Sequence, residues 1–88
     1  MIREAANTLA SRLNRTRGLR RFYAIVHSDN QVTLKGGRNM VTEEHKRLML
    51  TEAAKIGEEH RLTVTHHAHA NGAFSVLFNA STEKRGRA

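Results

Sequence analysis

Apolar residues near the start of the chain recur at the spacing of an α-helix. They follow one another at intervals of one, three and four positions: Ile2, Ala5, Ala6, Leu9 and Leu13. Because about 3.6 residues complete a helical turn, these side chains share one face. The pattern predicts an amphipathic helix over about residues 2–14, with Gly18 as a stop signal.

The next segment alternates apolar and polar residues, as a β-hairpin does. Residues 22–26 and 31–35 are predicted strands, and the residues between them favour a turn. A three-residue loop over residues 28–30, with Asn30 left-handed, would pair Val26 with Val32. One face then points to the core, with Phe22, Ala24, Val26, Val32 and Leu34. The other points outward, with Tyr23, Ile25, His27, Gln31, Thr33 and Lys35.

A second helix is predicted from a capping signal. Thr42 is a good N-cap, and Glu43 and Glu44 follow it in the first turn, where the helix dipole favours acids. The apolar spacing of Met49, Ala53 and Ile56 carries the helix to about residue 60.

A second hairpin follows, with strands over residues 61–68 and 73–79. If Gly72 is left-handed in a three-residue loop, His66 faces Val76 and Val64 faces Phe78. The predicted core face carries Leu62, Val64, His66, Phe74, Val76 and Phe78. The predicted outer face carries Thr63, Thr65, His67, His69, Ser75, Leu77 and Asn79.

The predicted order is α-β-β-α-β-β, an α+β fold. The simplest packing is a four-stranded, mainly antiparallel sheet with both helices on one face. We expect a single domain over residues 1–80 and a flexible basic tail over residues 81–88, which lack periodicity. The outer sheet face would be open, or covered by a second copy of the chain.

Composition limits the classes of function. With 88 residues the domain has a small core, which a homodimer would enlarge, and without cysteine it has no disulfide or thiolate metal site. No apolar run approaches the ~20 residues of a membrane span. Residues 1–7 lack the hydrophobic region of a signal peptide. We therefore expect a cytoplasmic protein that does not contact a membrane.

Positive charge is concentrated near the start of the chain. The net charge is +7, and residues 1–28 hold six Arg and one Glu, whereas residues 29–81 are balanced. Five arginines fall within ten positions: Arg12, Arg15, Arg17, Arg20 and Arg21. Guanidinium stays charged and offers a fork of donors that suits phosphate. The cluster favours contact with a nucleic acid; contact with an acidic protein, or a merely solvated helix end, are the alternatives.

Further candidates for this nucleic-acid-binding site are Tyr23 and Lys35, on the predicted outer face, and Arg38 after the second strand. An open sheet with an aromatic ring, imidazoles and a lysine could contact unpaired bases. Ile25 and Leu77 lie on the same predicted face and favour a subunit interface instead. Both interpretations stay open.

The histidines raise the question of catalysis. His67-Ala68-His69 matches the His–hydrophobic–His pattern of metal-dependent single-strand nickases. Such enzymes also need a tyrosine nucleophile and usually a third ligand, and Tyr23 is the only tyrosine. We expect His66 to be a hydrogen-bonded, half-buried core residue. The segment 35–38 lacks the spacing of a nucleotide-binding glycine loop. We therefore expect no enzymatic activity, no cofactor and no metal.

These observations lead to the hypothesis of a small non-enzymatic protein that binds RNA or DNA mainly through phosphate contacts. The alternative is a protein that binds and inhibits another protein, such as a phage or mobile-element product that blocks a nucleic-acid-handling enzyme. The expected partner is therefore a nucleic acid or a protein associated with one. A homodimer through the outer sheet face remains possible.

Overall fold

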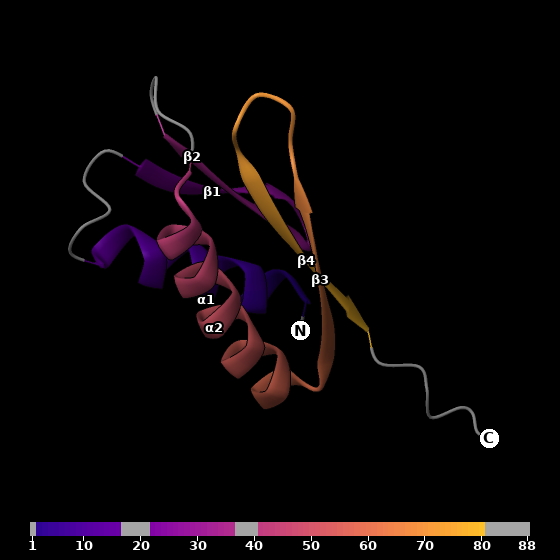
Figure 1. Cartoon of the computed structure of the whole chain (residues 1–88). Coiled ribbons are helices and arrows are strands. Elements are labelled where there is room, and N and C mark those ends of the chain that lie inside the picture. Colours follow the sequence, from indigo (N-terminus) through magenta and orange to yellow (C-terminus); the bar gives the residue numbers. More distant parts are fainter. Residues whose placement is uncertain (1, 17–21, 37–40, 81–88) are drawn as a thin grey trace.

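The computed structural model describes residues 2–16, 22–36 and 41–80. The elements follow the predicted order: α1 (Ile2–Arg15), β1 (Phe22–Ser28), β2 (Gln31–Gly36), α2 (Glu43–His60), β3 (Leu62–Ala68) and β4 (Phe74–Ala80). The strands form one antiparallel sheet in the order β1-β2-β4-β3. Both helices pack side by side on one face of it, which confirms the predicted α+β fold (Figure 1). The predicted tail and the stop at Gly18 lie outside the described residues.

The core fills the space between the helices and the sheet. Except for the half-buried Ile2, the amphipathic stripe of α1 is buried as predicted, and so is that of α2, through Met49, Ala53 and Ile56. From the sheet come Phe22, Ala24, Val32, Leu34, Phe74, Val76 and Phe78. These side chains form one continuous apolar cluster. No helix in the described part of the chain has both the length and the apolar character to span a membrane.

The first hairpin has the predicted register but a different turn. Val26 pairs with Val32 as expected, and Ser28 pairs with Gln31, which leaves a two-residue turn. A bulge at His27 supplies the extra residue that keeps the apolar alternation in phase. The prediction of a left-handed Asn30 was wrong, since Arg61 is the one non-glycine residue with positive φ in the described ranges.

Asn30 is held instead by contacts with β4. Its side-chain amide donates a hydrogen bond to the Phe78 carbonyl over 2.8 Å, and its own carbonyl accepts one from the Phe78 N–H, also over 2.8 Å. Both bonds join residues that are 48 positions apart in the sequence, so local turn chemistry could not predict them.

The second hairpin matches its prediction closely. His66 pairs with Val76 and Val64 with Phe78. Gly72 is left-handed, with a φ of 93°, and its N–H donates to the His69 carbonyl. Glycine is favoured here because a Cβ makes this backbone conformation costly.

Four residues predicted on the core face lie at the margin of the core, and two of them, Leu62 and Val64, are half-buried. Val26 is 36% exposed, and His66 is exposed and stacks on Phe74, with ring centroids 5.4 Å apart. The expectation of a half-buried, hydrogen-bonded His66 was therefore wrong. All four residues lie on edge strands, β1 and β3, where one flank has no neighbouring strand to cover the side chain.

Both ends of α2 are capped. The Thr42 hydroxyl accepts a hydrogen bond from the His45 N–H, as the sequence predicted. Arg61 was predicted to begin a strand, but it is the left-handed C-cap, and its N–H donates to the carbonyls of Glu58 and Gly57. Gly57 itself is buried against β3. The cap turns the chain sharply from the helix into β3.

The free edge of β1 is covered by a side chain of α1. The Asn14 amide donates to the Ala24 carbonyl over 3.0 Å, and its oxygen accepts from the Ala24 N–H over 2.8 Å. Exposed backbone groups on an edge strand invite pairing with another chain. Asn14 satisfies two of them and fixes the end of α1 against the sheet.

Candidate functional site

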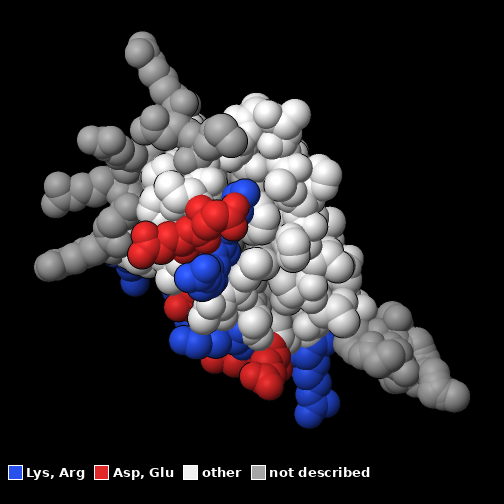
Figure 2. Space-filling view, viewed as in Figure 1, with Lys and Arg blue, Asp and Glu red and all other residues white. Residues whose placement is uncertain are grey.

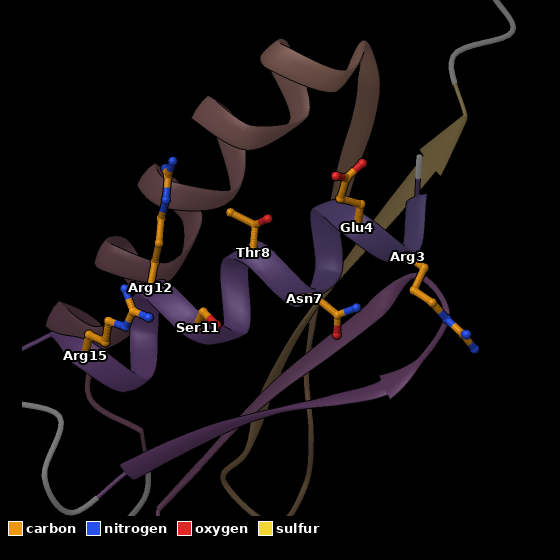
Figure 3. Close-up of a pocket in the computed structure, with 7 residues that line it drawn as sticks. All are labelled: Arg3, Glu4, Asn7, Thr8, Ser11, Arg12 and Arg15. Carbon is orange, nitrogen blue, oxygen red and sulfur yellow. The ribbon is translucent and has the colours of Figure 1, made fainter.

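The arginines predicted on the first helix lie on its exposed side. Figure 3 shows the shallow hollow along α1 that they help to line. Its lining residues are Arg3, Glu4, Asn7, Thr8, Ser11, Arg12 and Arg15. Because all of them come from one helix, the hollow is a surface groove and not an enclosed cavity.

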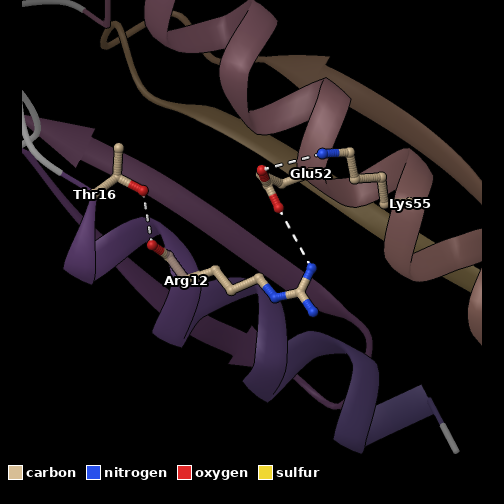
Figure 4. A network of polar contacts seen from close by, with 4 residues as sticks. All are labelled: Arg12, Thr16, Glu52 and Lys55. Atoms are coloured by element: carbon tan, nitrogen blue, oxygen red, sulfur yellow. Dashed lines mark hydrogen bonds and ion pairs between the residues drawn. The ribbon is translucent and has the colours of Figure 1, made fainter.

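Two arginines of this groove already have acidic partners. Arg12 Nη1 lies 3.4 Å from Glu52 Oε1, and Lys55 Nζ lies 3.9 Å from the other oxygen of the same carboxylate (Figure 4). Arg3 Nη2 lies 2.6 Å from Asp29 Oδ1. Exposed pairs of this kind stabilise a fold little. They do reduce the positive field that a phosphate would meet along α1.

The helix layer as a whole is not a positive surface. Together α1 and α2 carry six Lys or Arg residues and six Glu residues. Basic and acidic side chains mix over the helices in Figure 2. On this face a polyanion would be attracted by the Lys and Arg side chains and repelled by the neighbouring Glu side chains.

The outer face of the sheet has a different composition. Tyr23 and Lys35 lie directly opposite each other on β1 and β2, and Tyr23 is 49% exposed. Three imidazoles, those of His27, His67 and His69, lie on the same face. Among the described residues this face holds no Asp or Glu: every carboxylate is on a helix except Asp29, which is in the β1–β2 turn.

A chain of hydrogen bonds orders the middle of this face. Thr33 Oγ1 lies 2.7 Å from Ser75 Oγ, which lies 2.6 Å from His69 Nε2. The His67 ring meets the His69 ring edge-on, with centroids 4.8 Å apart. Thr33 and Ser75 point outward as predicted, yet both are buried, at 7% and 0% exposure. The face therefore has a fixed polar floor.

A hollow of about 270 Å³ crosses the outer face above this floor. β1 forms one wall and the β3–β4 turn forms the other, with β2 beneath. Its lining residues are Ile25, His27, Gln31, Thr33, Lys35, His69, Asn71 and Ala73. Of these, only Lys35 belongs to the site predicted from the sequence.

The structure thus divides the predicted site. Arg12 and Arg15 lie on the helix side, whereas Tyr23 and Lys35 lie on the opposite face of the sheet. The remaining predicted residues lie outside the described residues: Arg17, Arg20, Arg21 and Arg38.

The structure does place the residues that flank the segments 17–21 and 37–40, which contain these arginines. Phe22, where the chain resumes after the first segment, pairs with Gly36, which precedes the second. Val41, which follows the second, donates a backbone hydrogen bond to the Gly72 carbonyl over 3.1 Å. These anchor points adjoin the end of the sheet that carries Tyr23 and Lys35.

The site predicted from the sequence left out Gln31 and Asn71, and it included the imidazoles of the outer face only as contacts for unpaired bases, not by residue. The outward alternation of Gln31 and the histidines was visible, and Asn71 lay in the predicted turn. The hollow depends on the strand order and on the position of that turn beside β2, which alternation does not reveal. Within the described ranges, no group of three or more His, Cys, Asp or Glu side chains could hold a metal ion.

The chain matches no known protein family, and no curated protein or solved structure is significantly similar to it.

Proposed function

We propose that this protein is a cytoplasmic, non-enzymatic nucleic-acid-binding protein and that the outer face of its sheet is the contact surface. The observation that carries the proposal is the distribution of charge. The described part of this face has Lys35 and three imidazoles but no carboxylate, whereas the helix layer is balanced. A phosphate backbone therefore meets no like charge on the part of the outer face that the structure describes.

The arginine segments support the same proposal. Arg20 and Arg21 directly precede Phe22, Arg17 lies five positions before it, and Arg38 follows Gly36 by two positions. In sequence, both groups of arginines are therefore next to the strand ends beside the Tyr23–Lys35 pair. Arginine suits phosphate because its charge persists and its donors form a planar fork. We propose that these arginines bind the backbone that runs past the outer face.

A second candidate function is a protein-binding inhibitor or adaptor. The observation that favours it is a group of three exposed large apolar residues on β1, namely Tyr23, Ile25 and Val26. Such residues suit a protein partner or a second copy of the chain. We favour the nucleic acid because Val26 lies on the opposite side of the strand from the other two, which leaves a small apolar area on each face.

Binding measured against salt concentration tests the proposal. Fluorescence anisotropy with a labelled 12-nucleotide strand should show log affinity falling with log salt, with a slope of about −0.7 to −0.9 per neutralised phosphate. We expect contact with about 3–5 phosphates. Failure to bind any RNA or DNA at low salt would favour the protein-binding alternative, and tight binding that ignores salt would contradict the phosphate mechanism.

A further inference from the structure

We infer that the hollow on the outer sheet face takes one unpaired base, so that the ligand is a single-stranded nucleic acid. This inference rests on the proposed function and specifies its substrate class. Small-molecule pockets usually measure ~300–1,000 Å³, and this hollow measures about 270 Å³. Because its volume is below that range, we infer that it takes one small flat group, such as a single base, and not a larger ligand. A base inside a duplex is stacked and paired, and it cannot enter.

The walls of the hollow offer flat and apolar contacts to such a base. Ile25, 38% exposed, lies on one side with the His27 imidazole, and His69 lies on the other. Bases in single strands stack on planar side chains, imidazole included. Tyr23 stands two residues before Ile25 on the same face and offers a ring to the neighbouring base.

The polar groups of the hollow can hydrogen-bond to the edge of a base. The Asn71 side-chain oxygen accepts from the Ala73 N–H over 3.0 Å, which fixes the amide in place. Its NH₂ group has no hydrogen-bond partner among the described residues, so it can donate to a base. Gln31 brings a second amide to the same hollow.

The position of the His69 ring is set before a ligand arrives. The Thr33–Ser75–His69 chain of hydrogen bonds, with both hydroxyls buried, holds the imidazole at the wall. A side chain that is already ordered loses less entropy on binding. Lys35 lines the same hollow, where its ammonium can meet the phosphate of the bound nucleotide.

The test compares a 12-nucleotide strand, its duplex and a free nucleoside monophosphate in titrations with the intact protein. We expect the strand to bind at least about tenfold more tightly than the duplex. Ile25→Ala should weaken strand binding by about fivefold or more, because it removes apolar area from the wall of the hollow. His27→Ala, on the same wall, should also weaken it.

Val26→Ala is the matched control, because Val26 is an exposed valine on the same strand that faces the other way. It should change strand affinity by less than about twofold. If strand and duplex bind equally well and Ile25→Ala leaves the affinity unchanged, the inference is wrong but the proposed function is unaffected. Monophosphate bound as tightly as the strand would overturn the single-strand assignment. No binding to any of the three would overturn the proposed function itself.

Discussion

Gly57 shows how one residue sets the distance between two elements. A Cβ at this position would lie 2.7 Å from Val64 Cγ2 and 3.0 Å from the Leu62 carbonyl oxygen. Valine is stiff at χ1 and the carbonyl belongs to the backbone, so neither can move cheaply. The lack of a side chain at Gly57 therefore lets α2 pack directly on β3.

We predict that Gly57→Ala destabilises the fold by about 1–3 kcal/mol through overpacking. Helix propensity alone would predict the opposite, a gain of about 1 kcal/mol. Urea unfolding followed by circular dichroism measures the difference. The exposed Ala54 provides the control, since Ala54→Gly should destabilise by propensity alone. A stabilising Gly57→Ala would contradict the close approach.

Val26 and Val32 face each other across the first hairpin but differ in burial. Val32 is fully buried, whereas Val26 is 36% exposed beside the bulge. An unpaired charge in the core is costly because it loses its hydration. We predict that Val32→Asp unfolds the protein at room temperature and that Val26→Asp remains folded. Thermal unfolding of the two variants checks this; equal destabilisation would mean that β1 is covered at Val26.

At the scale of elements, the contact between Asn14 and Ala24 joins α1 to the edge of the sheet. We predict that Asn14→Ala costs about 1–3 kcal/mol, because it leaves two backbone groups of Ala24 without their partner. Amide hydrogen exchange should also show faster exchange of the Ala24 N–H. Asn7→Ala, an exposed change on the same helix, serves as the control: it should leave exchange at Ala24 unchanged and should stabilise the fold by no more than about 0.7 kcal/mol through helix propensity. Unchanged exchange at Ala24 would show that the edge is held by other contacts.

The alternation of residues was enough to predict each hairpin and its register. It could not predict which strands lie at the edges of the sheet, and Val26 and His66 were misplaced for that reason. The turn at Asn30 was also misassigned, because its conformation depends on hydrogen bonds to the distant Phe78. The N-cap at Thr42 and the left-handed Gly72 were predicted correctly, because the conformation at both positions depends on neighbouring residues in the sequence.

The candidate site was harder to predict for the same reason. Arg12 stands out in the sequence as part of a basic cluster, yet Glu52 from the other helix is its partner. Tyr23 and Lys35 were correctly placed together, because directly opposed residues follow from the hairpin register. The hollow needs β2 beside β4, a long-range pairing that no local pattern encodes.

At the scale of the whole molecule, the two faces differ in composition. The outer face carries His27, His67 and His69 beside Lys35, and its described part has no carboxylate. We predict that replacing all three histidines with Gln weakens strand binding by about fivefold or more at pH 7.5, because it removes the planar rings of this face.

Anisotropy titrations at constant ionic strength measure this effect. Unchanged affinity in that variant would contradict a contact between the imidazoles and the nucleic acid. A chelator should leave both folding and binding unchanged, since the mechanism needs no metal. Stoichiometric divalent metal in the purified protein, or strand cleavage that disappears in His67→Ala, would contradict the non-enzymatic proposal.

The central claim is that the outer sheet face, and not the helix layer, binds nucleic acid. It is tested most directly by reversing one charge on each face and measuring the affinity for a 12-nucleotide strand. Lys35 lies in the hollow of the outer face, and Lys55 is 62% exposed on α2 beside Glu52. The account predicts that Lys35→Glu weakens binding by about tenfold or more, whereas Lys55→Glu changes it by less than about threefold. Equal losses in the two variants, or a larger loss with Lys55→Glu, would contradict it.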